Sequence, residues 1–170
     1  MRSLNGTILD ATALIDFCYL KEWGWLQQHY SPLYIAQELL DSDKLEMSTR
    51  QVAHQYLTPL NISTEEVFAS FLEFGEKTPF LSVADRSTIA IARHQLLICA
   101  SDDGLVIETC KAYNIGYTRT LRLLGEMVDT EHKTVIEVMV MADQLIQERG
   151  KHISPQTLED WKKSLQKYGR

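Results

Sequence analysis

The stretch from residue 81 to residue 104, LSVADRSTIAIARHQLLICASDDG, restricts the folds open to this chain more than any other segment. Ser82 fits the cap of a helix, and Asp85 follows three residues later in the first turn. Residues 96–100 form a continuous apolar run that is short enough for a buried parallel strand. The stretch therefore predicts a helix that leads into a strand, and the strand ends in a serine and two aspartates.

Helix and strand together bring acidic residues to one edge of the expected sheet. A helix that feeds a parallel strand runs opposite to it, so Asp85 at the helix start and Asp102 and Asp103 at the strand end lie on the same rim. In open α/β sheets this carboxyl-end rim is where sites are built. Because successive side chains of an extended strand point to opposite faces, we expect only one of the two aspartates to face the site, and we favour Asp103.

Short apolar runs alternate with helical patterns along the rest of the chain. Strands are expected at residues 7–9, 33–36 and 96–100, and at 57–62 where Pro59 interrupts the run. Residues 114–117 are expected to form a turn into a short strand or loop. Further helices are expected at residues 11–22, 37–40, 48–56, 67–76, 105–113, 120–128, 134–149 and 155–168, with Trp-Gly-Trp at 23–25 ending or bending the first. This alternation predicts an α/β fold whose parallel sheet carries helices on both faces.

Length and composition are those of a soluble globular protein. The 170 residues are 45% hydrophobic and 24% charged, which suggests one domain with a substantial core. The net charge of −6 argues against a protein that wraps nucleic acid with a broad basic face. It does not exclude an enzyme whose metal ions recruit phosphate.

The expected location is the cytoplasm. No apolar run approaches the ~18 residues needed to span a bilayer, so no membrane association is expected. The N-terminus has no apolar core or small-residue cleavage pattern of a signal peptide. Cys18, Cys99 and Cys110 have no metal-ligand spacing and cannot all pair, which fits a reducing compartment.

Acidic residues at the expected strand ends and adjoining helix starts all fall on one rim of a parallel sheet; they are Asp10, Glu38, Asp85, Asp102 and Asp103. Carboxylates so placed repel one another, so either some stay protonated or a cation holds them together. Oxygen ligands favour Mg²⁺ or Mn²⁺ over Zn²⁺. Such a site activates water for phosphodiester hydrolysis with one or two metal ions. Taken singly, each acid also fits a structural role as a helix cap, dipole partner or turn residue.

Four segments resemble, in order, the acidic motifs of PIN-domain nucleases: ILDATALIDF, YIAQELL, LSVADRSTIAIA and LLICASDDGL. The agreement covers residues 7–116, and the tail, with Gly150 before Ile-Ser-Pro at 153–155, is similar to a PIN-like subgroup with extra C-terminal helices. The resemblance implies a single PIN-like domain over residues 1–170. It implies a three-layer core at 1–118 and a helical extension at 119–170.

The resemblance further implies a metal-dependent ribonuclease, of a kind that often serves as the toxin of a VapC-like toxin–antitoxin pair. The acids that would hold Mg²⁺ or Mn²⁺ and act in catalysis are Asp10, Glu38, Asp85 and Asp103, with Asp102 as the alternative to Asp103. Thr12 and Ser101 would support them. Arg119 is a candidate phosphate contact, although a solvated charge is its simpler interpretation.

Partners and competing functions follow from the same pattern. The substrate would be RNA, a protein antitoxin is a candidate partner that would cover the acidic rim, and a homodimer is expected. The main alternative is a catalytically inactive PIN-fold module that acts through protein contacts. A receiver-like phosphoacceptor domain fits less well, because its acidic pair follows the first strand, whereas here a lone Asp10 does.

Overall fold

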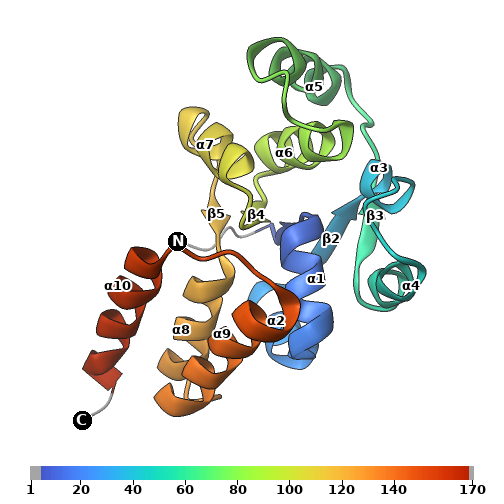
Figure 1. Cartoon of the computed structure of the whole chain (residues 1–170). Coiled ribbons are helices and arrows are strands. Elements are labelled where there is room, and N and C mark those ends of the chain that lie inside the picture. Colours follow the sequence, from blue (N-terminus) through green and yellow to red (C-terminus); the bar gives the residue numbers. More distant parts are fainter. Residues whose placement is uncertain (1–4, 169–170) are drawn as a thin grey trace. The chain divides into compact units, whose positions relative to one another are not determined.

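The computed structural model describes residues 5–168, and their strands form a five-stranded parallel sheet (Figure 1). The strands are β1 (Thr7–Leu9), β2 (Leu33–Ala36), β3 (Thr58–Leu60), β4 (Ile98–Ala100) and β5 (Tyr117–Thr118), and their order across the sheet is β3-β2-β1-β4-β5. Each neighbouring pair is parallel. The α/β class and the parallel sheet predicted from the sequence are confirmed.

The strand order reverses at β1. The strands β2 and β3 extend the sheet on one side of β1, and β4 and β5 extend it on the other. The register pairs Leu9 with Ala100, and the amide of Asp10 donates to the carbonyl of Ala100 at 3.1 Å. The ends of β1 and β4 are therefore level. The residues that follow them lie at the topological switch point, where open α/β sheets bind ligands.

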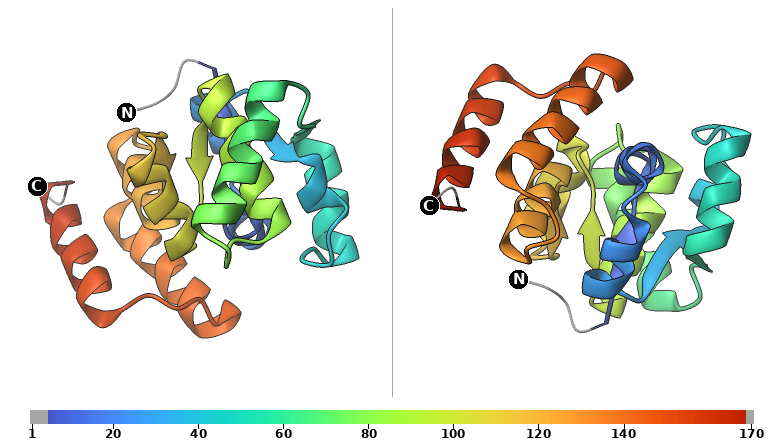
Figure 2. Two further views of the ribbon diagram at one scale, coloured as in Figure 1. Left: turned by 90° about the horizontal axis from the view of Figure 1, so that it is seen from above. Right: turned by 90° about the horizontal axis from the view of Figure 1, so that it is seen from below.

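Helices cover both faces of the sheet. Helix α6 (Val83–Gln95) contacts β1, β2 and β4, and α5 (Glu65–Lys77) packs on α6. Helix α1 (Ala11–Leu20) contacts β1 and α4 (Met47–Tyr56). In the two views of Figure 2, α5 and α6 lie in front of the sheet from above and α1 lies in front from below. This is the three-layer arrangement expected for the chain.

The central strands form the middle of the core because they are apolar on both faces. Ile8 and Leu9 of β1, Ile35 of β2 and Cys99 of β4 are fully buried. Helix α6 adds Ile89, whose side chain is likewise fully buried. Continuous apolar runs of this kind are typical of parallel strands covered on both sides.

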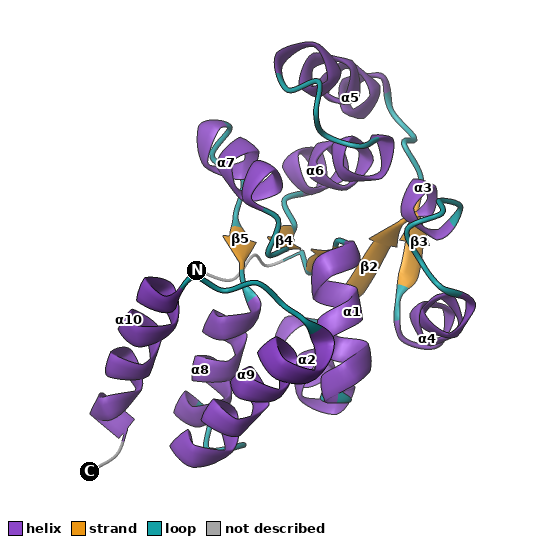
Figure 3. Cartoon of the chain, in the orientation of Figure 1, coloured by secondary structure: helices purple, strands orange, loops and turns teal. Residues whose placement is uncertain are grey.

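Polar caps fix where the helices near the rim begin. The side chain of Asp10 accepts from the amide of Ala13 at the start of α1, and Ser82 accepts from the amide of Asp85 at the start of α6. Two shorter helices complete this region, α3 (Gln37–Leu40) after β2 and α7 (Gly104–Ala112) after β4 (Figure 3). Because Asp10 follows β1 directly, its role as the cap of α1 also sets the direction of this rim side chain.

The expectation that Trp-Gly-Trp only ends or bends the first helix was wrong. A separate helix, α2 (Trp23–Tyr30), begins at Trp23. Trp23 and Trp25 are both buried, and the ring of Trp23 stacks on Tyr56 with centroids 5.0 Å apart. Packing of the two indoles outweighs the low helix propensity of the intervening glycine.

The strand expected at residues 96–100 is shorter than predicted. Leu96 ends α6 in the left-handed conformation, with φ of 55°, and β4 starts at Ile98. Apolarity alone does not distinguish a helix cap from the first residue of a strand. The other strands lie at or within the predicted ranges, and β5 begins at the last residue of the turn predicted at 114–117.

The described chain divides into two compact units, one ending at Arg119 and one starting at Thr120. The second unit holds α8 (Thr120–Asp129), α9 (Val135–Arg149), α10 (Pro155–Leu165) and a short 3-10 helix (Gln166–Tyr168). A capping box of Thr134 and Glu137 starts α9, and Gly150, with φ of 68°, ends it. Within the unit, the indole N–H of Trp161 donates to the carbonyl of Leu121 at 2.8 Å. The single-domain description of the whole chain stays a prediction.

Among the helices of residues 5–168, none combines the length and the apolar character that crossing a membrane requires.

Candidate active site

Asp10 is the most deeply buried of the five predicted rim acids. It follows β1, caps α1 and is 1% exposed. Its Oδ1 accepts hydrogen bonds from Thr12 Oγ1 at 2.7 Å and from the amide of Ala13 at 3.0 Å, and Ser101 Oγ donates to its Oδ2. Desolvation raises the pKa of Asp10 to about 6, although these hydrogen bonds lower it. The carboxyl group is thus held in one orientation in surroundings that disfavour its charge.

Two hydroxyl groups tie Asp10 to the turn after β4. Besides donating to Asp10, Thr12 Oγ1 accepts from the amide of Asp102 at 2.8 Å. Likewise Ser101 Oγ accepts from the amide of Asp103 at 3.0 Å. Both residues expected to support the site therefore lie beside Asp10. They connect the ends of β1 and β4, the two strands that flank the switch point.

Asp85 lies in the first turn of α6 and is 7% exposed. The charge of Asp85 also raises the pKa of Asp10, although this effect is smaller than those of desolvation and the hydrogen bonds. The two carboxyl groups are therefore within electrostatic reach. The Nζ of Lys44 lies 3.2 Å from Asp85 Oδ2 and donates to Ser82 Oγ at 2.8 Å. The sequence had not singled out Lys44, because it lies in a polar loop without a motif. Its partner Asp85 lies 41 positions further along the chain, too distant in sequence to suggest the contact.

Glu38 is the second residue of α3, the helix that directly follows β2. Its Oε2 is buried and has no hydrogen-bond partner among the described residues. A buried carboxylate oxygen without a partner is unfavourable and needs a structural explanation. A bound cation at the rim is such an explanation, because it would supply the missing positive charge.

Asp103 and Asp102 have different surroundings. Asp103 caps α7, where its Oδ1 accepts from the amides of Leu105 at 2.8 Å and Val106 at 3.3 Å. The Oδ1 atom of Asp102 lies 3.6 Å from Nε of Arg119, the residue that follows β5. The side chain of Arg119 is about half exposed at 48%, whereas that of Asp102 is 13% exposed. Each aspartate is thus engaged by a different part of the fold, and the preference for Asp103 as the ligand stays a prediction.

The donor chemistry of the rim fits a hard divalent cation. All five predicted ligands offer carboxylate oxygens, which Mg²⁺ and Mn²⁺ prefer, and one of those oxygens, on Glu38, is buried and unpaired. Within residues 5–168, no three Asp, Glu, His or Cys side chains are already gathered to hold a metal ion. Two of the acids are instead engaged by cationic side chains, Asp85 by Lys44 and Asp102 by Arg119.

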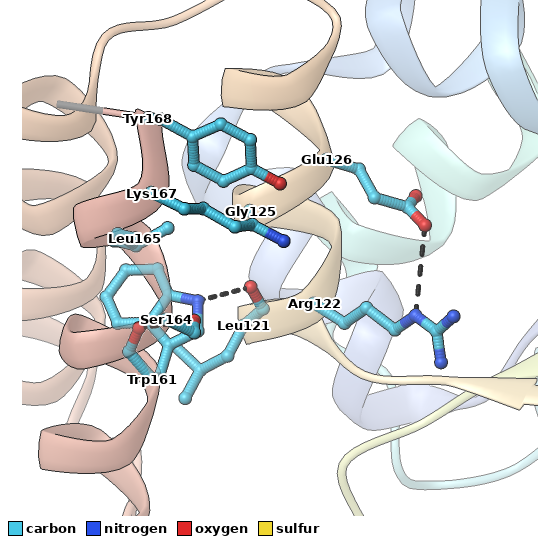
Figure 4. Close-up of a pocket in the computed structure, with 9 residues that line it drawn as sticks. All are labelled: Leu121, Arg122, Gly125, Glu126, Trp161, Ser164, Leu165, Lys167 and Tyr168. Atoms are coloured by element: carbon cyan, nitrogen blue, oxygen red, sulfur yellow. Dashed lines mark hydrogen bonds and ion pairs between the residues drawn. The ribbon is translucent and has the colours of Figure 1, made fainter. Parts of the chain in front are cut away.

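A separate pocket of about 260 Å³ lies within the second unit (Figure 4). Trp161, Lys167 and Tyr168 line one side, and Arg122 and Glu126 of α8 line another. The indole of Trp161 already donates to a carbonyl of α8, and Nε of Arg122 lies 3.8 Å from Glu126 Oε1. These polar groups are satisfied within the protein, so the rim at the end of the sheet remains the candidate site.

Comparison with known proteins gives one family match and a similar solved structure. The family model described as PIN domain matches residues 6–167. The crystal structure of PAE2754 from Pyrobaculum aerophilum is similar with a TM-score of 0.52 and 16% sequence identity, over 73% of this chain and 90% of that chain. At this identity the likeness concerns the fold alone. Comparison with curated proteins gave no match.

Proposed function

This chain belongs to the PIN-domain family, a nuclease-type family whose members typically use divalent metal ions, and from that premise we propose that it is a metal-dependent endoribonuclease. Its reaction would be hydrolysis of phosphodiester bonds in single-stranded or structured RNA. The cation would be Mg²⁺ or Mn²⁺.

One observation carries the proposal, which is the environment of Asp10. Asp10 is buried at the topological switch point, and desolvation raises its pKa to about 6. Its ionised form is therefore unfavourable for folding, and such perturbed groups are typical of functional sites. Two hydroxyl groups hold the carboxyl group in place, that of Thr12 after the end of β1 and that of Ser101 after the end of β4. A carboxylate that is buried, oriented and short of positive charge has the properties of a preorganised cation ligand.

The residues of the candidate site would have different roles in the reaction. Asp10, Glu38 and Asp85, with Asp103 or Asp102, would hold the cation, which when bound supplies an activated water and positive charge for the phosphoryl oxygens. Thr12 and Ser101 orient Asp10 through their hydroxyl groups. The exposed guanidinium of Arg119, beside Asp102, is suited to contact an RNA phosphate.

The toxin role is a further proposal. A protein antitoxin with a basic or amphipathic segment would cover the acidic rim, and the net charge of −6 supports a partner of opposite charge. A homodimer and a cytoplasmic location belong to the same proposal. The toxin role, the antitoxin and the homodimer rest on the family resemblance, whereas the cytoplasmic location rests on the cysteines and on the character of the sequence.

A second candidate function is a PIN-fold module that binds a protein partner without catalysis. The ion pair between Lys44 and Asp85 favours it, because a permanently neutralised Asp85 would not serve as a cation ligand. In this case Asp10 would act only as the cap of α1.

Cleavage of single-stranded RNA by the purified full-length chain separates the two functions. We expect cleavage with Mn²⁺ and none with EDTA. The cleavage rate of Asp10→Asn should be at least about a hundredfold lower, because a neutral amide does not replace a charged carboxylate ligand. Asp143→Asn is a matched control, since Asp143 is an exposed aspartate of α9 in the second unit. Cleavage that survives both EDTA and Asp10→Asn would contradict the nuclease proposal. No cleavage of any RNA would favour the binding module.

A further inference from the structure

Lys44 supplies a cation from within the chain at the predicted metal site. It lies between α3 and α4, and its Nζ contacts two groups at the start of α6. The contact with Asp85 Oδ2 is 3.2 Å and that with Ser82 Oγ is 2.8 Å. The Asp85 side chain is 9% exposed, whereas that of Lys44 is 39% exposed. The ammonium group therefore reaches inward from a half-exposed stem to a nearly buried carboxylate.

The loop that carries Lys44 is held in place at several points. Nη2 of Arg50 donates to the carbonyls of Ser42 at 2.9 Å and Leu45 at 3.3 Å. Ser42 Oγ donates to the carbonyl of Leu39 at 2.8 Å and accepts from the amide of Lys44 at 3.3 Å. The side chain of Leu45 is buried. Lys44 is thus presented by an ordered loop, which lowers the entropy lost when its side chain pairs with Asp85.

The charge on Asp85 matters beyond its own ion pair. The Asp85 carboxylate is close enough to Asp10 to contribute to the electrostatics of that buried group. Lys44 neutralises it with a compact single charge that holds one carboxylate oxygen. A divalent cation held by Asp85 together with Asp10 would need the same carboxylate. The ammonium group and the divalent cation would therefore compete for the negative charge of Asp85.

We propose that Lys44 is a built-in counter-ion of Asp85 that competes with the divalent cation and so sets the cation affinity of the site. This inference rests on the proposed function, since it assumes that Asp85 is a cation ligand. Lys44 compensates the charge of Asp85 while no cation is bound. It also makes binding of the cation weaker than the carboxylates alone would allow.

The test is the affinity of the full-length protein for Mn²⁺, measured by isothermal titration calorimetry and by the electron paramagnetic resonance signal of free Mn²⁺. We expect Lys44→Met to lower the Mn²⁺ dissociation constant about tenfold, because a unit charge next to a ligand is removed in a partly solvated setting. Lys44→Gln, a second neutral variant, should do the same, and Lys44→Arg should stay close to the wild type. Lys111→Met is the matched control, since Lys111 pairs with Glu108 at 3.3 Å on the exposed surface of α7.

The outcomes distinguish this inference from the proposed function. If the wild type binds Mn²⁺, Asp10→Asn does not, and both neutral Lys44 variants bind no more tightly than Lys111→Met, the counter-ion inference is wrong while the metal site stands. If the neutral variants bind more weakly, Lys44 holds Asp85 in position for the cation instead, which also overturns the inference. If the wild type itself binds no Mn²⁺, both the inference and the metal-dependent function are wrong.

Discussion

At Asp10, burial and hydrogen bonding act on the same carboxyl group in opposite directions. Desolvation raises the pKa from 3.8 to about 6, and this exceeds the lowering by Ser101, Ala13 and Thr12. Between pH 3.8 and about 6, Asp10 therefore holds a proton in the folded protein but has released it in the unfolded chain. Ionised Asp10 lowers the stability of the fold, and perturbed carboxyl groups of this kind are typical of functional sites.

The first prediction concerns this titration in metal-free protein. A carboxyl group whose folded-state pKa is raised destabilises the fold above that pKa and stops doing so as the pH falls toward the unfolded value. We expect Asp10 to lower the free energy of unfolding by roughly 2 to 3 kcal/mol between pH 4 and pH 7. Urea unfolding in EDTA at several pH values measures this contribution as the difference between the wild type and Asp10→Asn.

The difference between the two proteins isolates Asp10 from the other carboxyl groups, which titrate in both. The free energy of unfolding of the wild type should fall relative to that of Asp10→Asn as the pH rises from about 4 to about 6, and the difference should then level off. Parallel profiles would show that the Asp10 carboxyl titrates alike in the folded and unfolded states.

At the scale of the element, Asp103 connects the candidate site to α7, the helix that follows it. Asp103 caps α7 with one carboxylate oxygen, and its own amide is held by Ser101. A residue in this position has two separable properties, an acceptor for the amides of the first helical turn and a negative charge on the rim. Substitutions can remove one of them and keep the other.

The second prediction uses this separation. Asp103→Ala should lose about 1 kcal/mol of stability, because the amides of Leu105 and Val106 lose their acceptor. Asp103→Ser should keep the wild-type stability to within a few tenths of a kcal/mol, since serine is an equivalent cap. If Asp103 is a cation ligand, both variants should bind Mn²⁺ more weakly, as calorimetry would measure.

Asp102→Asn is the matched comparison, because Asp102 faces Arg119 and does not cap α7. Should Asp102→Asn lose Mn²⁺ binding while Asp103→Ser retains it, the ligand is Asp102 and the preference for Asp103 is wrong.

For the whole molecule, cation binding at the rim would be linked to folding, because the proposed ligands come from separate parts of the first unit. Asp10 follows β1, Glu38 follows β2, and Asp85 belongs to α6. The unfolded chain does not hold these side chains together. A cation that binds them therefore favours the folded state by mass action.

The third prediction is a Mn²⁺-dependent increase in stability. At a concentration one hundred times the dissociation constant, the cation should add about 2.7 kcal/mol to the free energy of unfolding. Thermal or urea unfolding with and without Mn²⁺ measures it, and EDTA should reverse it. Asp10→Asn should show little or no increase, while the exposed variant Asp143→Asn should behave as the wild type. An equal increase in Asp10→Asn would indicate binding elsewhere.

Much of the fold could be predicted because it rests on local patterns. The apolar runs at β1 and β2 and the cap at Ser82 act within a few residues, so the sequence shows them directly. Helix α2 could not be predicted, since its helical state depends on packing of Trp23 against Tyr56, a residue of another helix. The start of β4 was misplaced because Leu96 is apolar but caps α6 in a left-handed conformation.

By itself, the sequence determined that this protein is a parallel α/β domain of the PIN type with its acids at strand ends, because periodicity, caps and motifs are local properties. Only the tertiary structure decided how each acid is engaged. It buries Asp10 between two hydroxyl groups, leaves an oxygen of Glu38 unpaired and brings Lys44 to Asp85, 41 positions further along the chain. Desolvation and charge pairing depend on distances in space, and those distances exist only once the sheet has aligned β1 with β4.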